Sequence, residues 1–128
     1  MNVTHFFICR KKHFNDKQQQ MDAYGIYYCP VDITPTGEVP ITVLAAIEVD
    51  PGEDGRRLKV CIDSPGGGRS WVPLQTISNL NREQRVGWFH GSGPFVAREP
   101  GDYIFHLKTD EAGPDLAPAC CLRMKQPG

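Results

Sequence analysis

The sequence predicts an all-β fold, a two-sheet antiparallel β-sandwich of about eight strands with little or no helix. Runs of five to nine β-branched or aromatic residues recur along the chain. Each run is closed by a cluster of Gly, Pro, Asn or Asp, as in domains built from many short strands. A chain of 128 residues supports one hydrophobic core. We therefore expect a single domain over residues 1–128, with immunoglobulin-like or jelly-roll-like topology.

Two runs near the start predict the first two strands. Residues 3–9 place Val3, His5, Phe7 and Cys9 on one face, and neither face is plainly polar. That pattern predicts a central strand, or one covered on both sides. Residues 22–29 contain three tyrosines and predict a second, half-buried strand. The polar stretch 10–21 between them has no apolar period and predicts a long hairpin loop.

The clearest pattern lies in the middle of the chain. Residues 30–40 hold three prolines and predict a connection to another edge or sheet. Residues 41–49 and 57–63 then alternate strongly and flank a turn at 51–55, which predicts an antiparallel hairpin with one face in water. Its expected core residues are Ile41, Val43, Ala45, Ile47, Val49, Leu58, Val60 and Ile62, and Thr42, Glu48, Arg57, Lys59 and Asp63 are expected to face solvent.

Four further strands complete the predicted sandwich. Residues 71–77 predict an edge strand or a bulge because Pro73 interrupts them. A strand at 85–90 is expected to end at the turn 91–94, and residues 102–109 and 117–124 predict a closing antiparallel pair. Residues 78–85 fit a short helical turn or a polar turn equally well.

Composition narrows the class of protein. Fourteen basic and 15 acidic residues give a formal net charge of −1, which makes nucleic acid an unlikely partner. The first residues have the wrong order of charge and apolar run for a secretory signal, and no apolar run approaches the length of a membrane span. Five cysteines without framework spacing predict reduced thiols. We therefore expect a cytoplasmic protein with no membrane partner.

The segment EPGDYIFHL at residues 99–107 resembles the Pro-Gly-x-Tyr-x-Phe-x-Leu strand opening of immunoglobulin-like sandwiches. Together with HFFICR, DAYGIYYCP and the strand end at 48–50, it makes the chain similar to small uncharacterised bacterial β-sandwich proteins. The resemblance implies the fold and no activity, because those proteins have none assigned. The pair Cys120 and Cys121 departs from the expected apolar alternation of the last strand.

The sequence contains no strong signal for a catalytic, metal or phosphate site. The histidines and cysteines show no closely spaced ligand pair for a metal, and Ser64 lacks the spacing of a nucleophile elbow. The glycines at 66–68 precede a strand rather than the helix that a phosphate loop needs. We therefore expect no catalytic residue, metal or cofactor.

Two sets of residues are candidates for binding. The first is a basic interaction loop, comprising Arg10, Lys11, Lys12, His13, Phe14 and Lys17. The second is a set of aromatic residues that a ligand or sugar could stack on, comprising Trp71, Trp88, Tyr27 and Tyr28. The same aromatics would also suit a sandwich core.

The leading hypothesis is a non-enzymatic protein that acts through protein contacts, as a homo-oligomer or an accessory subunit. It rests on the lack of paired catalytic or ligand spacing and on the two-sided apolar strand at 3–9, which needs covering. The alternative is a small-ligand or carbohydrate-binding module that uses Trp71 or Trp88.

Overall fold

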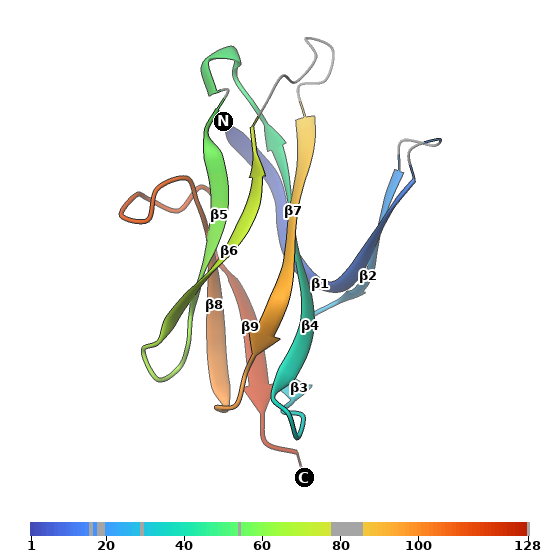
Figure 1. Ribbon diagram of the computed structural model, residues 1–128, viewed down its shortest axis with the longest axis vertical. Helices are drawn as coiled ribbons and strands as arrows, with labels where there is room; N and C mark the ends of the chain where they lie inside the picture. Colours follow the sequence, from blue (N-terminus) through green and yellow to red (C-terminus); the bar gives the residue numbers. More distant parts are fainter. Residues whose placement is uncertain (16, 18–19, 29, 54, 78–85, 128) are drawn as a thin grey trace.

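A computed structural model describes residues 1–128 except 16, 18–19, 29, 54, 78–85 and 128 (Figure 1). The described residues form strands and one short 3-10 turn and contain no α-helix, which confirms the predicted all-β sandwich. The elements are β1 (Asn2–Asn15), β2 (Gln20–Ile26), β3 (Val31–Asp32), β4 (Glu38–Glu48), η1 (Pro51–Glu53), β5 (Arg57–Asp63), β6 (Arg69–Thr76), β7 (Val86–Val96), β8 (Gly101–Lys108) and β9 (Cys120–Lys125).

Two sheets face each other. Sheet A has the order β2-β1-β4-β7, and all its neighbours are antiparallel. Sheet B has the order β3-β9-β8-β5-β6 and is antiparallel except where the short β3 pairs with β9. The core between the sheets includes the predicted residues Ile41, Val43, Ala45, Ile47, Leu58, Val60 and Ile62. Burial of each large side chain contributes roughly 1.5–3 kcal/mol before entropy is subtracted.

The predicted pairing of residues 41–49 with 57–63 is wrong. In the structure β4 pairs with β1 and β7, whereas β5 pairs with β6 and β8. The turn at 51–55 therefore carries the chain from sheet A to sheet B. Alternation shows which face of a strand is buried, but it does not show which strand lies beside it.

Three predicted boundaries also change. β1 continues to Asn15, so most of the predicted loop at 10–21 is paired strand. β3 lies inside the predicted connection at 30–40, and β7 runs to Val96 through the predicted turn at 91–94. β7 is an edge strand, where glycine and proline disturb few hydrogen bonds. The turn expected at 78–85 lies outside the described residues.

A bulge in β1 changes the predicted faces of that strand. Val3 lies opposite Ile47 and His5 opposite Ala46, so Thr4 is an extra residue. Val3 consequently packs against the core rather than sharing a face with His5. Neither face of β1 is wholly solvated, as the sequence predicted, although the membership of each face is different.

Both flanks of the sandwich are closed by contacts between the sheets. On one flank the His90 backbone N–H donates to Oε1 of Gln75 at 2.7 Å and joins β7 to β6. On the other, the Cys120 thiol donates to the carbonyl oxygen of Phe6 at 3.1 Å and joins β9 to β1. The two sheets are thus held in a fixed relation.

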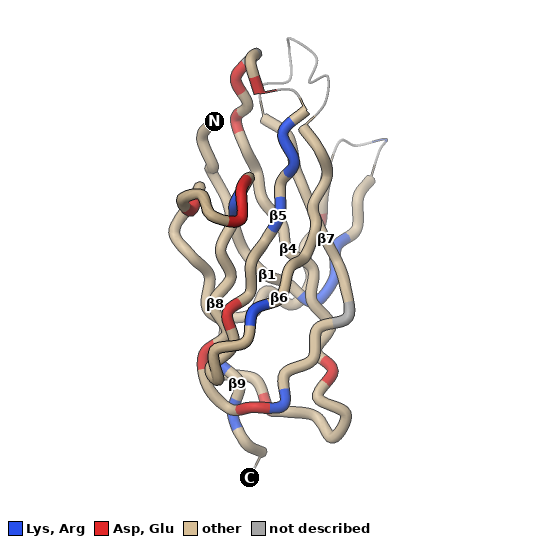
Figure 2. The backbone as a smooth tube through the Cα atoms, turned by 60° about the vertical axis from the view of Figure 1, so that its left-hand side comes forward, with Lys and Arg blue, Asp and Glu red and all other residues tan. Residues whose placement is uncertain are grey.

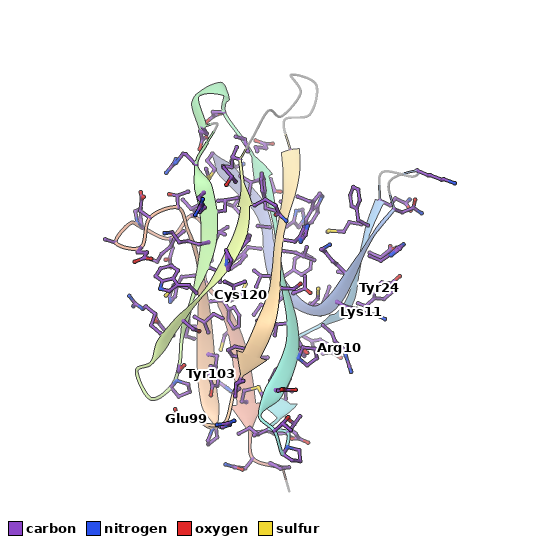
Figure 3. The ribbon with its side chains drawn as sticks, in the orientation of Figure 1. Arg10, Lys11, Tyr24, Glu99, Tyr103 and Cys120 are labelled. Carbon is purple, nitrogen blue, oxygen red and sulfur yellow. The ribbon has the colours of Figure 1, made fainter. Side chains whose placement is uncertain are left out.

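Tyr103 links the start of β8 to the turn before it (Figure 3). Its hydroxyl donates to the Glu99 carbonyl oxygen at 3.0 Å and accepts from the Glu99 N–H at 3.3 Å. The bond resembles the tyrosine corner of immunoglobulin-like sandwiches. Gly101, with φ +129°, allows the turn to pass Pro65.

Replacing Tyr103 with phenylalanine is expected to lower the free energy of unfolding by about 1 kcal/mol, because the ring stays packed and only the hydrogen bonds are lost. Urea denaturation followed by circular dichroism measures the change. Tyr24→Phe, at a half-exposed tyrosine, is the matched control and should change stability by less than about 0.5 kcal/mol. Equal effects of both variants would contradict a structural role for the corner.

Candidate functional site: the aromatic face and the hairpin arm

The outer face of sheet A carries an aromatic cluster that we call the aromatic face, formed by His5, Phe7 and Trp88. The Trp88 ring stacks on His5 with centroids 5.8 Å apart and meets Phe7 edge-on at 6.2 Å. Trp88 remains 40% exposed. The rings come from β1 and β7, which flank the central strand β4. The cluster is therefore held by rigid elements while half of its indole meets water.

The middle of this face is buried although no described strand lies over it (Figure 1). Thr42, Leu44 and Ala46 of β4 are all buried, which corrects the prediction that Thr42 faces solvent. Leu44 lies opposite Phe7 and His90 in the flanking strands, so larger neighbours cover it. The outer face of β4 is thus largely apolar and buried between the flanking strands β1 and β7.

The second feature is the arm, which we define as residues 10–15 of β1 together with β2. β4 pairs with β1 only as far as Cys9, so beyond that point β1 pairs only with β2. Figure 1 shows this hairpin curving away from the sandwich. Gly25 has φ +68° and lies against the Arg10 side chain. A left-handed glycine at this position accommodates the bend.

The arm carries the residues predicted as an interaction loop, but on a strand. Arg10, Lys11, Lys12, His13 and Phe14 belong to β1, and Lys17 lies in the turn that follows. The sequence missed this strand because both faces of the arm are largely exposed, and no apolar alternation is then required.

Positive charge on the arm is unbalanced among the described residues (Figure 2). Neither the arm's Arg10, Lys11 and Lys12 nor Lys17 in the turn forms an ion pair with a described acid, whereas Arg56, Lys59, Arg69, Lys108, Arg123 and Lys125 each do. Lys11 instead lies over the Tyr24 ring, 5.4 Å from its centroid. The arm is therefore a local source of positive potential on a nearly neutral chain.

A pocket of about 320 Å³ separates the arm from β7. Its lining residues are Lys12, Phe14, Met21, Trp88 and His90. Burial, followed by the positive charge of Lys12, lowers the pKa of His90 below its ordinary value. The pocket thus combines aromatic walls, one cation and an imidazole that favours its neutral form.

The four predicted stacking residues do not form one platform. Trp88 lies on the outer face of sheet A, whereas Trp71 is on β6 in sheet B, with the Lys59 ammonium 5.5 Å from its ring centroid. Tyr27 donates its hydroxyl to the Pro40 carbonyl oxygen at 2.6 Å, and Tyr28 is 90% exposed. Only Trp88 of this set lines the pocket beside the arm.

No family model, curated protein or solved structure matches this chain. Geometry alone therefore carries the interpretation of the site. Within the described part of the chain, no helix is long and apolar enough to cross a membrane.

The described thiols are poorly suited to act as nucleophiles. Burial raises the pKa of Cys9 and of Cys61, and burial together with the neighbouring Cys121 raises the pKa of Cys120 to about 11. The exposed Cys121 also has a raised pKa, through desolvation and then the charge of Asp102. These thiols stay protonated at neutral pH. Cys29 lies outside the described residues.

A charged network on the outer face of sheet B was not predicted. His106 bonds Asp63 through Nε2 at 3.2 Å and Asp115 through Nδ1 at 2.7 Å, and Arg69 donates to Asp63 at 2.8 Å. The Arg69 bond holds the pKa of Asp63 below its usual value. These partners come from β5, β6, β8 and the segment after β8, so their spacing in sequence gave no signal. No described group of three or more His, Cys, Asp or Glu is arranged to hold a metal ion.

Sequence reasoning also missed the aromatic face as a unit. His5, Phe7 and His90 were not singled out for binding, because nothing local shows that β1 and β7 flank one central strand. The signal that was present is the apolar character of both faces of residues 3–9. That pattern predicted that the outer surface of this strand is partly covered, but it did not predict which strands lie beside it.

Proposed function

We propose that this protein is a non-enzymatic, cytoplasmic β-sandwich that acts through protein contacts, as a homo-oligomer or an accessory subunit, and that the aromatic face is its contact surface. The observation that carries the proposal is Trp88, a half-exposed indole fixed between His5 and Phe7. Large aromatic side chains on rigid strands are the residues that dominate binding energy at protein interfaces.

The arm adds to this support. A two-stranded hairpin is marginally stable in water unless it packs on something else. Phe14 on the arm is 49% exposed, and Val86 beside Trp88 on β7 is 45% exposed. A partner seated on the aromatic face would remove these apolar side chains from water, stabilising the complex by roughly 25 cal/mol for each Å² buried.

Sedimentation velocity over a range of protein concentrations tests the proposal. The wild-type chain is expected to self-associate, and Trp88→Ser to weaken that association about 30-fold, as for loss of a central interface tryptophan. Trp71→Ser makes the same change on sheet B and should leave association intact. A wild-type protein that stays monomeric, or assembly that survives Trp88→Ser, would contradict self-association through this face.

A second candidate is a ligand-binding module, and the pocket between the arm and β7 favours it. Its volume of about 320 Å³ suits a small molecule, with Trp88 and Phe14 as apolar walls and Lys12 as a cation. A monomeric protein whose Trp88 fluorescence changes saturably with a sugar or a small aromatic acid would replace the first proposal by this one.

A further inference from the structure

The edge of sheet A formed by β2 is the least protected sheet edge in the described residues. Three other strands lie at the edges of the sheets. β3 is only two residues long. β6 contains Pro73 and β7 contains Pro94, and these two strands contact each other through Gln75 and His90. β2 has seven residues and contains neither proline nor lysine. Short strands, prolines and lysines are the usual means of blocking an edge, so β2 is open to another strand.

The ladder with β1 shows which backbone groups of β2 face outward. The Tyr27 N–H donates to the Ile8 carbonyl oxygen at 3.1 Å, which makes these two residues a hydrogen-bonded pair. At Gly25, with φ +68°, the alternation is interrupted, and Arg10 and Gly25 are not paired. Pairing resumes beyond Gly25, from Lys11 with Tyr24 to Asn15 with Gln20. There the Tyr24 backbone hydrogen-bonds the Cys9 thiol and therefore faces β1. Because hydrogen-bonded and non-hydrogen-bonded pairs alternate in an antiparallel ladder, Met21 and Ala23 direct their N–H and C=O groups to the open edge.

Basic side chains lie next to this edge on both faces of the arm. The Arg10 side chain lies against Gly25, and its Cβ, Cγ and Cδ atoms are 2.9–3.9 Å from where a Cβ at Gly25 would be. The stem of Arg10 therefore extends over β2. Lys12 lies opposite the small Ala23, while Lys11 lies over Tyr24 on the other face (Figure 3). A strand added to β2 would come within reach of these cations.

We infer that β2 binds an acidic, extended peptide segment of a partner protein by strand addition to sheet A. The inference deepens the proposed function and rests on it in taking a protein as the partner. The open N–H and C=O groups select an extended peptide backbone, and the arm's cations, unpaired by described acids, select its charge. A nucleic acid would satisfy the charge but not the row of backbone groups. A second copy of β2 would instead bring two sets of the same cations together.

Fluorescence anisotropy with a labelled peptide in which Glu alternates with Val and Thr tests this inference. We expect saturable binding that weakens with added salt, and no binding of the peptide with Lys in place of Glu. Arg10→Glu should weaken binding about three- to tenfold, because it replaces an attraction with a repulsion. Arg57→Glu, an equal charge change at an exposed residue of β5, should have no effect.

Proline substitutions on β2 separate strand addition from charge attraction. Ala23→Pro removes an N–H that faces the open edge and is expected to abolish binding, whereas Ala23→Ser keeps that N–H and should bind equally well. Met21→Pro removes the next outward N–H and supplies an independent variant. Retention of the native circular dichroism spectrum shows that each variant is folded.

Three outcomes would overturn the inference. They are failure of the acidic peptide to bind, binding unchanged by both proline variants, and equal binding of an oligothymidylate, which would assign the arm to nucleic acid. None of them affects self-association, which is measured by sedimentation and depends on Trp88. A protein that assembles but does not bind the peptide therefore contradicts only this inference, and one that binds the peptide as a monomer contradicts only self-association.

Discussion

Replacing Phe105 with alanine is expected to lower the free energy of unfolding by about 3–5 kcal/mol, the cost of removing a fully buried aromatic ring and leaving a cavity. Phe105 is on β8 and has no exposed surface. Its ring centroid lies 5.8 Å from that of Phe95, which in turn meets Tyr103 edge-on at 5.3 Å. The Phe105 ring therefore contacts the inner faces of both sheets. The cavity left by its removal would persist, because the paired strands on either side cannot easily move together.

Urea denaturation with tryptophan fluorescence measures this loss, and Ile104→Ala on the same strand is the matched control. Ile104 is the next residue and lies on the partly exposed outer face of sheet B. Its truncation should cost less than half as much, because solvent already reaches the side chain. Phe105→Leu keeps most of the volume and provides a folded variant if the alanine protein does not fold. Equal losses at residues 104 and 105 would contradict the assignment of faces on β8.

The strand that contains Phe105 shows what sequence patterns predict well. Tyr103, Phe105 and Leu107 alternate with more polar residues, and all three are buried in the core. The same reasoning identified the inward residues of β4 and β5 but paired the two strands with each other. Alternation is a property of one strand and its environment, whereas pairing depends on contacts between distant segments.

The candidate site was predicted less completely, for the same reason. Trp71 and Trp88 each lie in a run that predicts a strand, and only the sheet order shows that they are in different sheets. The basic residues of the arm were predicted as an interaction loop, but Arg10 to Phe14 lie on a strand that gave no signal, because an exposed hairpin requires no apolar residues. A bulge at Thr4 likewise leaves no sequence signal, although it reverses the face of Val3.

Gly91→Ala is the second substitution with a large expected effect, about 1–3 kcal/mol or more from overpacking. Gly91 is buried on β7, where β7 passes β6. A Cβ atom there would lie 2.5 Å from the Pro73 carbonyl oxygen and 3.0 Å from Cγ1 of Val72. The first of these is a backbone atom, which cannot rotate away, so the two strands must separate.

Gly93→Ala is the control, on the same strand and with no atom within 4 Å of its added Cβ. It should change stability by less than about 1 kcal/mol, in either direction. Because Trp88 and His90 precede Gly91 on β7, displacement of this strand should also disturb the aromatic face. Gly91→Ala is therefore expected to weaken self-association as well as stability, and Gly93→Ala to change neither. Loss of stability with unchanged assembly would show that the contact surface does not depend on the position of β7, against the role proposed for Trp88.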